Sequence, residues 1–223
     1  TNNSNKKNES NSKDFIKKLK YCRYNKKRFS LIPIYLMLNS CDYSEAHFNY
    51  IIFDNKKNIV ERFDPYGVYN YESFETFLWF DKDFKTLLKN NKLNMTYITP
   101  KQTCLDTGFQ DQEEKDISRG RASVRKNDFG GYCGPWSIYY SDLRLKYPDI
   151  EPDILQRIIL KKLKKNPKTL RQFIRDYSTK LKKYKYDVLR EINDSCKDVS
   201  TDRFASVNCF QEFKELKLYK LLK

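Results

Sequence analysis

The chain has one histidine, His47, and a cysteine, Cys133, inside the segment GGYCGPW, and these two side chains are best suited to nucleophilic chemistry. Pro135 is tolerated in a helix only in its first turn, so Cys133 is predicted at a helix N-terminus. That position stabilises a thiolate over the thiol, and the flanking glycines let a substrate backbone come close. The alternative is a cysteine that only packs before an aromatic-rich helix.

His47 opens a run of aromatic and β-branched residues, 47–54, that is typical of a strand. Residues 55–58 (NKKN) predict a hairpin turn, and residues 59–64 a returning strand that ends at Asp64. The outer ends of an antiparallel hairpin lie side by side, so His47 and Asp64 are expected at one edge of the sheet. There a carboxylate can bind one imidazole nitrogen while the other faces a thiol. Alternatively, Asp64 caps the following turn.

The chain order His47, Asp64, Cys133, with FDPYG at 63–67, resembles the adenovirus endopeptidase and SUMO-protease superfamily of cysteine peptidases. The segment around Cys133 is most similar to proteases of large nucleocytoplasmic DNA viruses, and the resemblance covers about residues 45–150. It implies an α+β fold: a mixed β-sheet flanked by helices, with the nucleophile at the N-terminus of a central helix. In this resemblance His47 is the base and Asp64 orients it.

The same resemblance implies a glutamine that donates to the oxyanion. The stretch from Gly108 to Gln110 looks like the Gly-x-Gln element of some viral relatives, so Gln110 is the predicted donor. A side-chain amide suits this role because it donates a hydrogen bond without carrying charge. Gln112 and Asn127 stay open as alternatives.

The resemblance therefore predicts a cysteine endopeptidase that processes viral structural precursors after small residues, often glycine. An isopeptidase that removes a ubiquitin-like modifier is the alternative within the same chemistry. The expected partner is a protein or peptide substrate, and the reaction needs neither a metal nor an organic cofactor. A hypothesis from another class is a non-enzymatic, basic nucleic-acid-binding virion protein that keeps the fold.

The chain is strongly basic, with 44 Lys and Arg against 29 Asp and Glu and a formal net charge of +15. Between residues 156 and 186 basic side chains alternate with Ile and Leu, which indicates amphipathic helices with a basic outer face. Such a face predicts non-specific binding to nucleic acid, weakened by salt. The alternatives are a solvated helix face and a Lys-rich composition that follows from A/T-rich coding DNA.

Length and composition predict a disordered tail at 1–12 and a single domain over 13–223, with a basic helical part at about 153–223. The longest apolar run, 31–38, is too short to span a membrane. None of the six cysteines forms a C-x-x-C pair. They indicate a reducing compartment, which for a viral protein means the host cytoplasm or the virion.

The apolar patterns predict further elements and indicate which side chains within them are buried or exposed. Arg62 stands between strand apolars and is expected on the solvent face, whereas Trp136 and the Tyr139-Tyr140 pair are expected to pack the helix after Cys133. The remaining elements are a basic helix at 14–24, a strand at 29–38 with Pro33 at an edge or a bulge, one helix at 71–90 or two that meet near Asp81, a strand at 95–99 and a long loop at 100–130.

Overall fold

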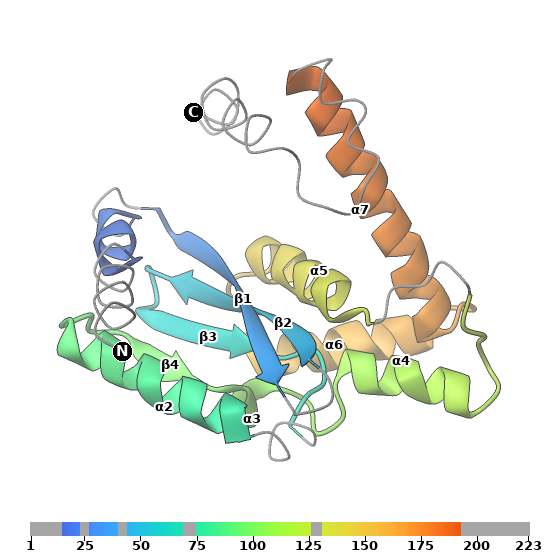
Figure 1. Cartoon of the computed structure of the whole chain (residues 1–223), viewed down its shortest axis with the longest axis horizontal. Coiled ribbons are helices and arrows are strands. Elements are labelled where there is room, and N and C mark those ends of the chain that lie inside the picture. Colours follow the sequence, from blue (N-terminus) through green and yellow to red (C-terminus); the bar gives the residue numbers. More distant parts are fainter. Residues whose placement is uncertain (1–14, 23–26, 40–43, 69–74, 126–130, 193–223) are drawn as a thin grey trace. The chain divides into compact units, whose positions relative to one another are not determined.

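A computed structural model of the chain describes residues 15–22, 27–39, 44–68, 75–125 and 131–192 (Figure 1). The backbone divides into two compact units, Thr1–Gln172 and Phe173–Lys223. The single domain over 13–223 therefore stays a prediction. The predicted tail at 1–12 and the part of the basic C-terminal region after residue 192 lie outside the described residues.

A four-stranded sheet forms the centre of the first unit, in the order β1-β2-β3-β4. The strands β1 (Phe29–Asn39) and β2 (Ser44–Asp54) are antiparallel, as are β2 and β3 (Ile59–Phe63), whereas β4 (Thr96–Ile98) pairs with β3 in parallel. The sheet is mixed, and β1 is an edge strand, as Pro33 predicts. The turn at 55–58 closes the β2–β3 hairpin.

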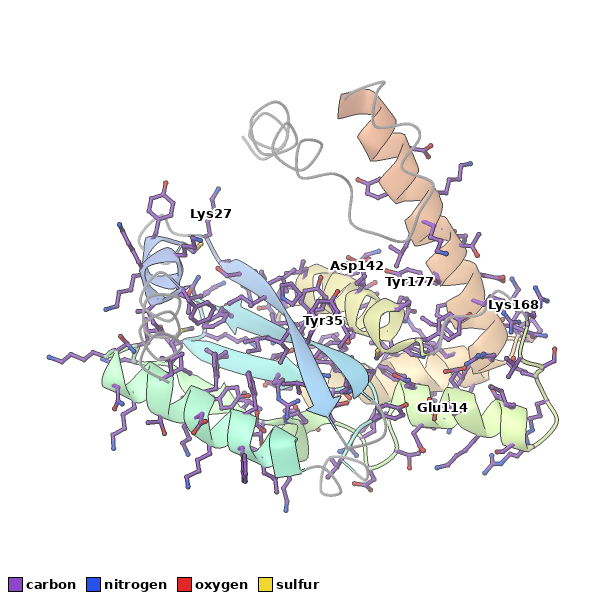
Figure 2. All side chains as sticks on the ribbon, in the orientation of Figure 1. Lys27, Tyr35, Glu114, Asp142, Lys168 and Tyr177 are labelled. Carbon is purple, nitrogen blue, oxygen red and sulfur yellow. The ribbon has the colours of Figure 1, made fainter. Side chains whose placement is uncertain are left out.

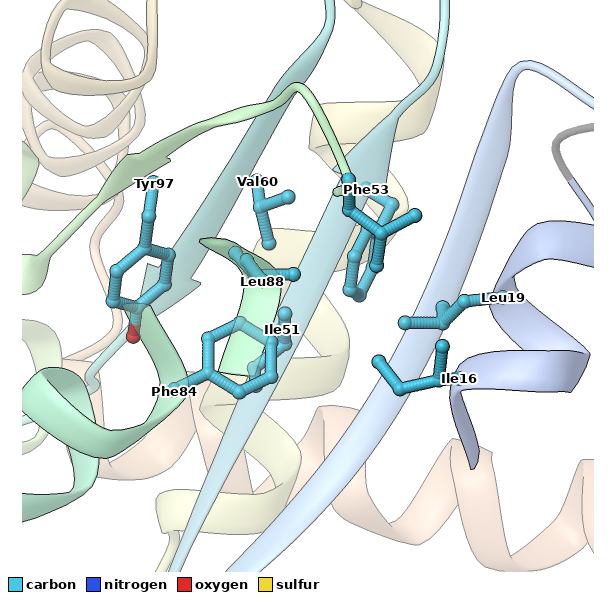
Figure 3. Packing of buried hydrophobic residues seen from close by; sticks show 9 residues of the cluster. Ile16, Leu19, Ile51, Phe53, Val60, Phe84, Leu88 and Tyr97 are labelled. Atoms are coloured by element: carbon cyan, nitrogen blue, oxygen red, sulfur yellow. The ribbon is translucent and has the colours of Figure 1, made fainter. Parts of the chain in front are cut away.

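An apolar core covers one face of the sheet (Figure 3). Side chains of β2 and β3 pack there against α2 (Glu75–Asn90) and a helix over residues 15–22. Figure 3 labels eight of its members, which are Ile16, Leu19, Ile51, Phe53, Val60, Phe84, Leu88 and Tyr97. Alternating side chains of a strand point to opposite faces, so the neighbours of these core residues point to the other face.

That other face carries α5 (Cys133–Lys146), which begins at Cys133, as Pro135 predicts. Trp136 and Tyr140 are fully buried, and the ring of Phe63 on β3 stacks on Tyr140 with centroids 4.0 Å apart. The Ser137 hydroxyl donates to the carbonyl of Phe48 at 3.2 Å and ties α5 to β2. The predicted packing role of Trp136 and Tyr140 is confirmed.

The predicted long loop at 100–130 is wrong within its described part, because α3 (Pro100–Thr103) and α4 (Phe109–Ser118) lie there. The buried side of α4 consists mostly of polar residues, namely Gln110, Glu113 and Asp116 beside Phe109. A helix with this inward face shows no apolar periodicity in its sequence, which is why the pattern did not predict it.

The described part of the C-terminal region is helical, as predicted, and consists of α6 (Pro152–Lys164) and α7 (Leu170–Ile192), which are separated near Pro167. The α+β class is confirmed: a mixed sheet lies between helices, and a helical region follows. Across the described ranges, every helix is too short or too polar to span a membrane.

Candidate active site

His47 on β2 and Asp64 directly after β3 lie side by side, as the hairpin register predicts. The Nε2 atom of His47 is 2.9 Å from Oδ1 of Asp64, and both side chains are buried. The backbone N–H of Tyr66 donates to the same Oδ1 at 3.0 Å, and the Tyr66 ring lies 5.1 Å from the imidazole. The imidazole is therefore held by the Asp64 carboxylate at Nε2 and by the neighbouring Tyr66 ring.

Cys133 is the first residue of α5, and its thiol is hydrogen-bonded to His47. Because Nε2 of His47 is bound to Asp64, Nδ1 is the nitrogen left for the sulfur. Backbone groups of Phe48 and Gly134 also hydrogen-bond the sulfur and favour its ionised form. The structure thus brings the three predicted residues together, with His47 between Asp64 and Cys133.

The electrostatics of this arrangement favour a thiolate–imidazolium pair. Burial alone would raise the pKa of Cys133, but hydrogen bonds from His47 and from the backbone of Phe48 lower it below its ordinary value. Burial likewise opposes a charged His47, yet Asp64 and Cys133 outweigh it and raise the His47 pKa to about 9. Each member of the pair therefore stabilises the charged form of the other.

Asp64 remains ionised although it is buried. Burial would raise its pKa, but the charge and hydrogen bond of His47, the charge of Arg62 and the Tyr66 N–H lower it. A buried carboxylate in this state can accept from an imidazolium and fix its orientation.

The turn after Asp64 is docked onto the start of α4, and two glycines make this docking fit. Gly67 has a φ of +85°, and a Cβ there would lie 2.3 Å from the carbonyl oxygen of Leu105. A Cβ on Gly108 would lie 2.2 Å from the carbonyl oxygen of Pro65. The N–H of Gly108 donates to the Tyr66 carbonyl at 2.8 Å. The segment FDPYG at 63–67 and the segment at 108–110 that ends in Gln110 are therefore in contact.

Gln110 lies in the first turn of α4 and is 2% exposed. A Cβ on Gly131, two residues before the cysteine, would lie 3.3 Å from the Gln110 Nε2. Nε2 donates one hydrogen bond to Glu114 at 3.1 Å, and Oε1 is buried with no hydrogen-bond partner among the described residues. Because a carboxylate only accepts, Glu114 requires that the NH₂ group, and not the oxygen, faces it.

The two alternative donors have other positions. Gln112 points away from this amide, because its Nε2 donates to the carbonyl of Thr107 at 2.7 Å. Asn127 lies outside the described residues.

Three residues of the site were not predicted from the sequence. Arg62, expected on the solvent face, is fully buried, so that prediction is wrong. Arg62 follows the core residue Val60 by two positions on the same strand, so both side chains point to the same face of the sheet. This spacing could have indicated that Arg62 is buried. Tyr66 and Glu114 are joined by a 2.9 Å hydrogen bond from the tyrosine hydroxyl to Oε1. Glu114 lies on the exposed side of α4 (Figure 2). No sequence signal indicated this bond.

A metal centre would need clustered ligands. Within the described ranges, no group of three or more His, Cys, Asp or Glu side chains is placed to hold a metal ion.

Comparison with known proteins gives one relative, and this chain matches only a part of it. The chain is 30% identical over 196 residues to an ankyrin repeat protein of Acanthamoeba polyphaga mimivirus. The match covers 82% of this chain but spans only 24% of the relative's length. No protein-family profile and no solved structure matches the chain. Ankyrin repeats are units of about 33 residues with two helices each, whereas the described part of this chain is built on a mixed sheet.

The single histidine allows a direct test of the charge arrangement. In the NMR spectrum of the protein, the one imidazole signal should titrate with a midpoint near pH 9 instead of the ordinary 6.5. Asp64→Asn should lower the midpoint, because burial lowers the His47 pKa and the charge of Asp64 no longer offsets this effect. Asp106→Asn, on an exposed residue, is the control and should leave it in place.

The sign of the stability effect follows from the raised pKa. Charged His47 stabilises the fold fully below pH 6.5, and this contribution is lost as the pH rises toward 9. A midpoint at or below 6.5 in the wild-type protein would contradict the ion pair.

Proposed function

We propose that the chain is a cysteine peptidase in which Cys133 is the nucleophile, His47 the base and Asp64 the residue that orients the base. The observation that carries the proposal is the position of His47, bonded to the buried Asp64 on one side and to the thiol of Cys133 on the other. A histidine that served packing alone would not need a carboxylate and a thiol on opposite ring nitrogens.

The mechanism follows from this geometry. His47 holds the thiol proton as an imidazolium, and the Cys133 thiolate attacks a peptide or isopeptide carbonyl. The developing oxyanion accepts hydrogen bonds from the second Nε2 hydrogen of Gln110 and from the backbone N–H of Cys133. His47 then protonates the leaving amine, which departs, and Cys133 is left as a thioester. Water, activated by His47, hydrolyses the thioester and restores the thiol.

The substrate class is part of the proposal. The similarity to a mimivirus protein supports a viral setting, in which the substrates are structural precursors cut after small residues such as glycine. The chain then works in the reducing host cytoplasm or in the virion. An isopeptidase acting on a ubiquitin-like modifier uses the same chemistry, and a panel of modifier-derived probes separates the two.

A peptide vinyl sulfone ending in Gly-Gly should form an adduct with Cys133, detected by peptide mass spectrometry. Cys133→Ala should abolish the adduct, and His47→Ala should slow its formation by about 10²–10⁴-fold. Cys22→Ala is the matched control and should change nothing. Cys104 should stay unlabelled, because burial raises its pKa to about 12. Labelling of Cys22 at the rate of Cys133 would refute the proposal.

The oxyanion donor has a matched control two positions away on the same helix. Gln110→Ala should lower kcat for a Gly-Gly amide substrate by about 10²–10³-fold, because the amide donates mainly to the transition state. Gln112→Ala should leave kcat unchanged, since its amide is engaged with Thr107. Equal losses in both variants would exclude Gln110 as the donor.

Nucleic-acid binding is the second candidate function, and two neighbouring basic cavities favour it. One, of about 810 Å³, lies between α4 and the α6–α7 connection, and the other, of about 410 Å³, lies along α6. Only Asp106 and Asp116 bring acidic side chains to them. Their basic side chains are Lys115, Arg119, Arg121, Arg157, Lys161, Lys164, Lys165 and Lys168. Such a surface attracts phosphate backbones.

The triple variant Lys161→Glu, Lys164→Glu, Lys165→Glu should lose most of its binding to duplex DNA, measured by fluorescence anisotropy. The slope of log K against log salt should shrink in magnitude by about 2 to 3, the number of phosphate contacts removed. The control changes three exposed lysines of α2, Lys82, Lys85 and Lys89, to Glu and alters the net charge equally. If both triple variants lose binding alike, net charge and not this surface binds DNA.

A further inference from the structure

Arg62 lies on β3, two residues before Asp64, and its side chain is 0% exposed. The guanidinium contacts both carboxylate oxygens of Asp81 on α2, through Nε at 2.8 Å and Nη2 at 3.1 Å. Its third nitrogen, Nη1, donates to the Asn49 side chain and to Oδ2 of Asp64 at 3.4 Å. Arg62 thus reaches the oxygen of Asp64 that His47 does not use.

We propose that Arg62 is a positioning residue of the candidate active site: held by Asp81, it keeps Asp64 ionised and turned toward His47. The inference rests on the proposed peptidase site and adds to it a buried ion pair that touches neither Cys133 nor the approach to it.

The reason is the cost of a buried carboxylate. Asp64 is 1% exposed, so water cannot stabilise its charge, and a protonated acid would not support an imidazolium. A cation in hydrogen-bond contact favours the ionised form. Arginine supplies this cation permanently, because its guanidinium does not lose its proton in proteins.

Asp81 fixes where that cation lies. A two-bond contact between a guanidinium and a carboxylate sets both the distance and the plane of the guanidinium. Asp81 is itself held by the Tyr97 hydroxyl of β4, and the Phe80 ring lies 5.7 Å from the guanidinium carbon. Asp81 and Tyr97 thus position Arg62 from α2 and β4, which carry neither His47 nor Cys133, and Asn49 adds one contact from β2.

Other titratable groups face the network, and two of them stay neutral near pH 7. Burial raises the pKa of the Tyr97 hydroxyl and of the Cys104 thiol, which lies near Asp64 and Arg62. The groups whose charge changes together with Asp64 are therefore His47 and Cys133.

The test is the pH dependence of Cys133 alkylation by iodoacetamide in the full chain, resolved by peptide mass spectrometry. Arg62→Met should move the midpoint of the rate–pH curve up by about one pH unit, so Cys133 reacts about tenfold more slowly below it. Arg62→Lys should shift it less, because lysine keeps the charge but cannot contact both carboxylates in the same way. In an Asp64→Asn background, Arg62→Met should add no further shift.

Arg144→Met is the matched control. Arg144 is also a buried arginine paired with a carboxylate, Glu61, at 3.0 Å, but it does not touch Asp64. Its loss should destabilise the fold and leave the midpoint in place. A shift in Arg144→Met as large as in Arg62→Met would overturn the inference, because lost packing would then explain both.

The remaining outcomes separate this inference from the proposed function. If Arg62→Met does not fold, Arg62→Lys decides: an upward shift supports the inference and an unchanged midpoint overturns it. A shifted Asp64→Asn with unchanged Arg62 variants overturns the role of Arg62 alone. A wild-type Cys133 that reacts no faster than Cys22 overturns the proposed function and this inference together.

Discussion

Three charged residues, Glu61, Arg62 and Asp64, are buried on or directly after the strand β3. A buried charge is costly unless it is paired, so each of them needs a partner from another element. Glu61 points to one face and pairs with Arg144 of α5, whereas Arg62 points to the other and pairs with Asp81 of α2. Because side chains alternate along a strand, this one segment fixes a helix on each face of the sheet.

A second constraint acts at the end of the same strand. The turn that follows Asp64 lies against the start of α4, at a separation that leaves no room for a Cβ on Gly67 or Gly108. This close contact sets where α4 begins, and with it the position of Gln110 beside Gly131. The carboxylate that holds His47 and the Gln110 amide beside Gly131 are thus positioned by one turn.

The parts that could be predicted from the sequence depend on local geometry. A short turn sets the register of a hairpin, which was enough to place His47 beside Asp64, and Pro135 was enough to place Cys133 at the start of α5. The position of Gln110 was expected only from a resemblance. Arg62 was misplaced because its partner Asp81 lies 19 residues away on a helix, and such a contact leaves no local pattern. The helix α4 was not predicted because its buried face is mostly polar and leaves no apolar periodicity in the sequence.

Five ionisable groups in contact run from α2 to α5, namely Asp81, Arg62, Asp64, His47 and Cys133. Buried ion pairs add little net stability, so the stability of the fold does not account for this chain of charges. Proton transfer from Cys133 to His47, as the proposed mechanism requires, leaves its total charge unchanged and gives signs that alternate from Asp81 to the thiolate. Each new charge then lies beside its opposite, provided that Asp64 is ionised before and after the transfer. Arg62, the one member that cannot lose its charge, is the group that meets this condition.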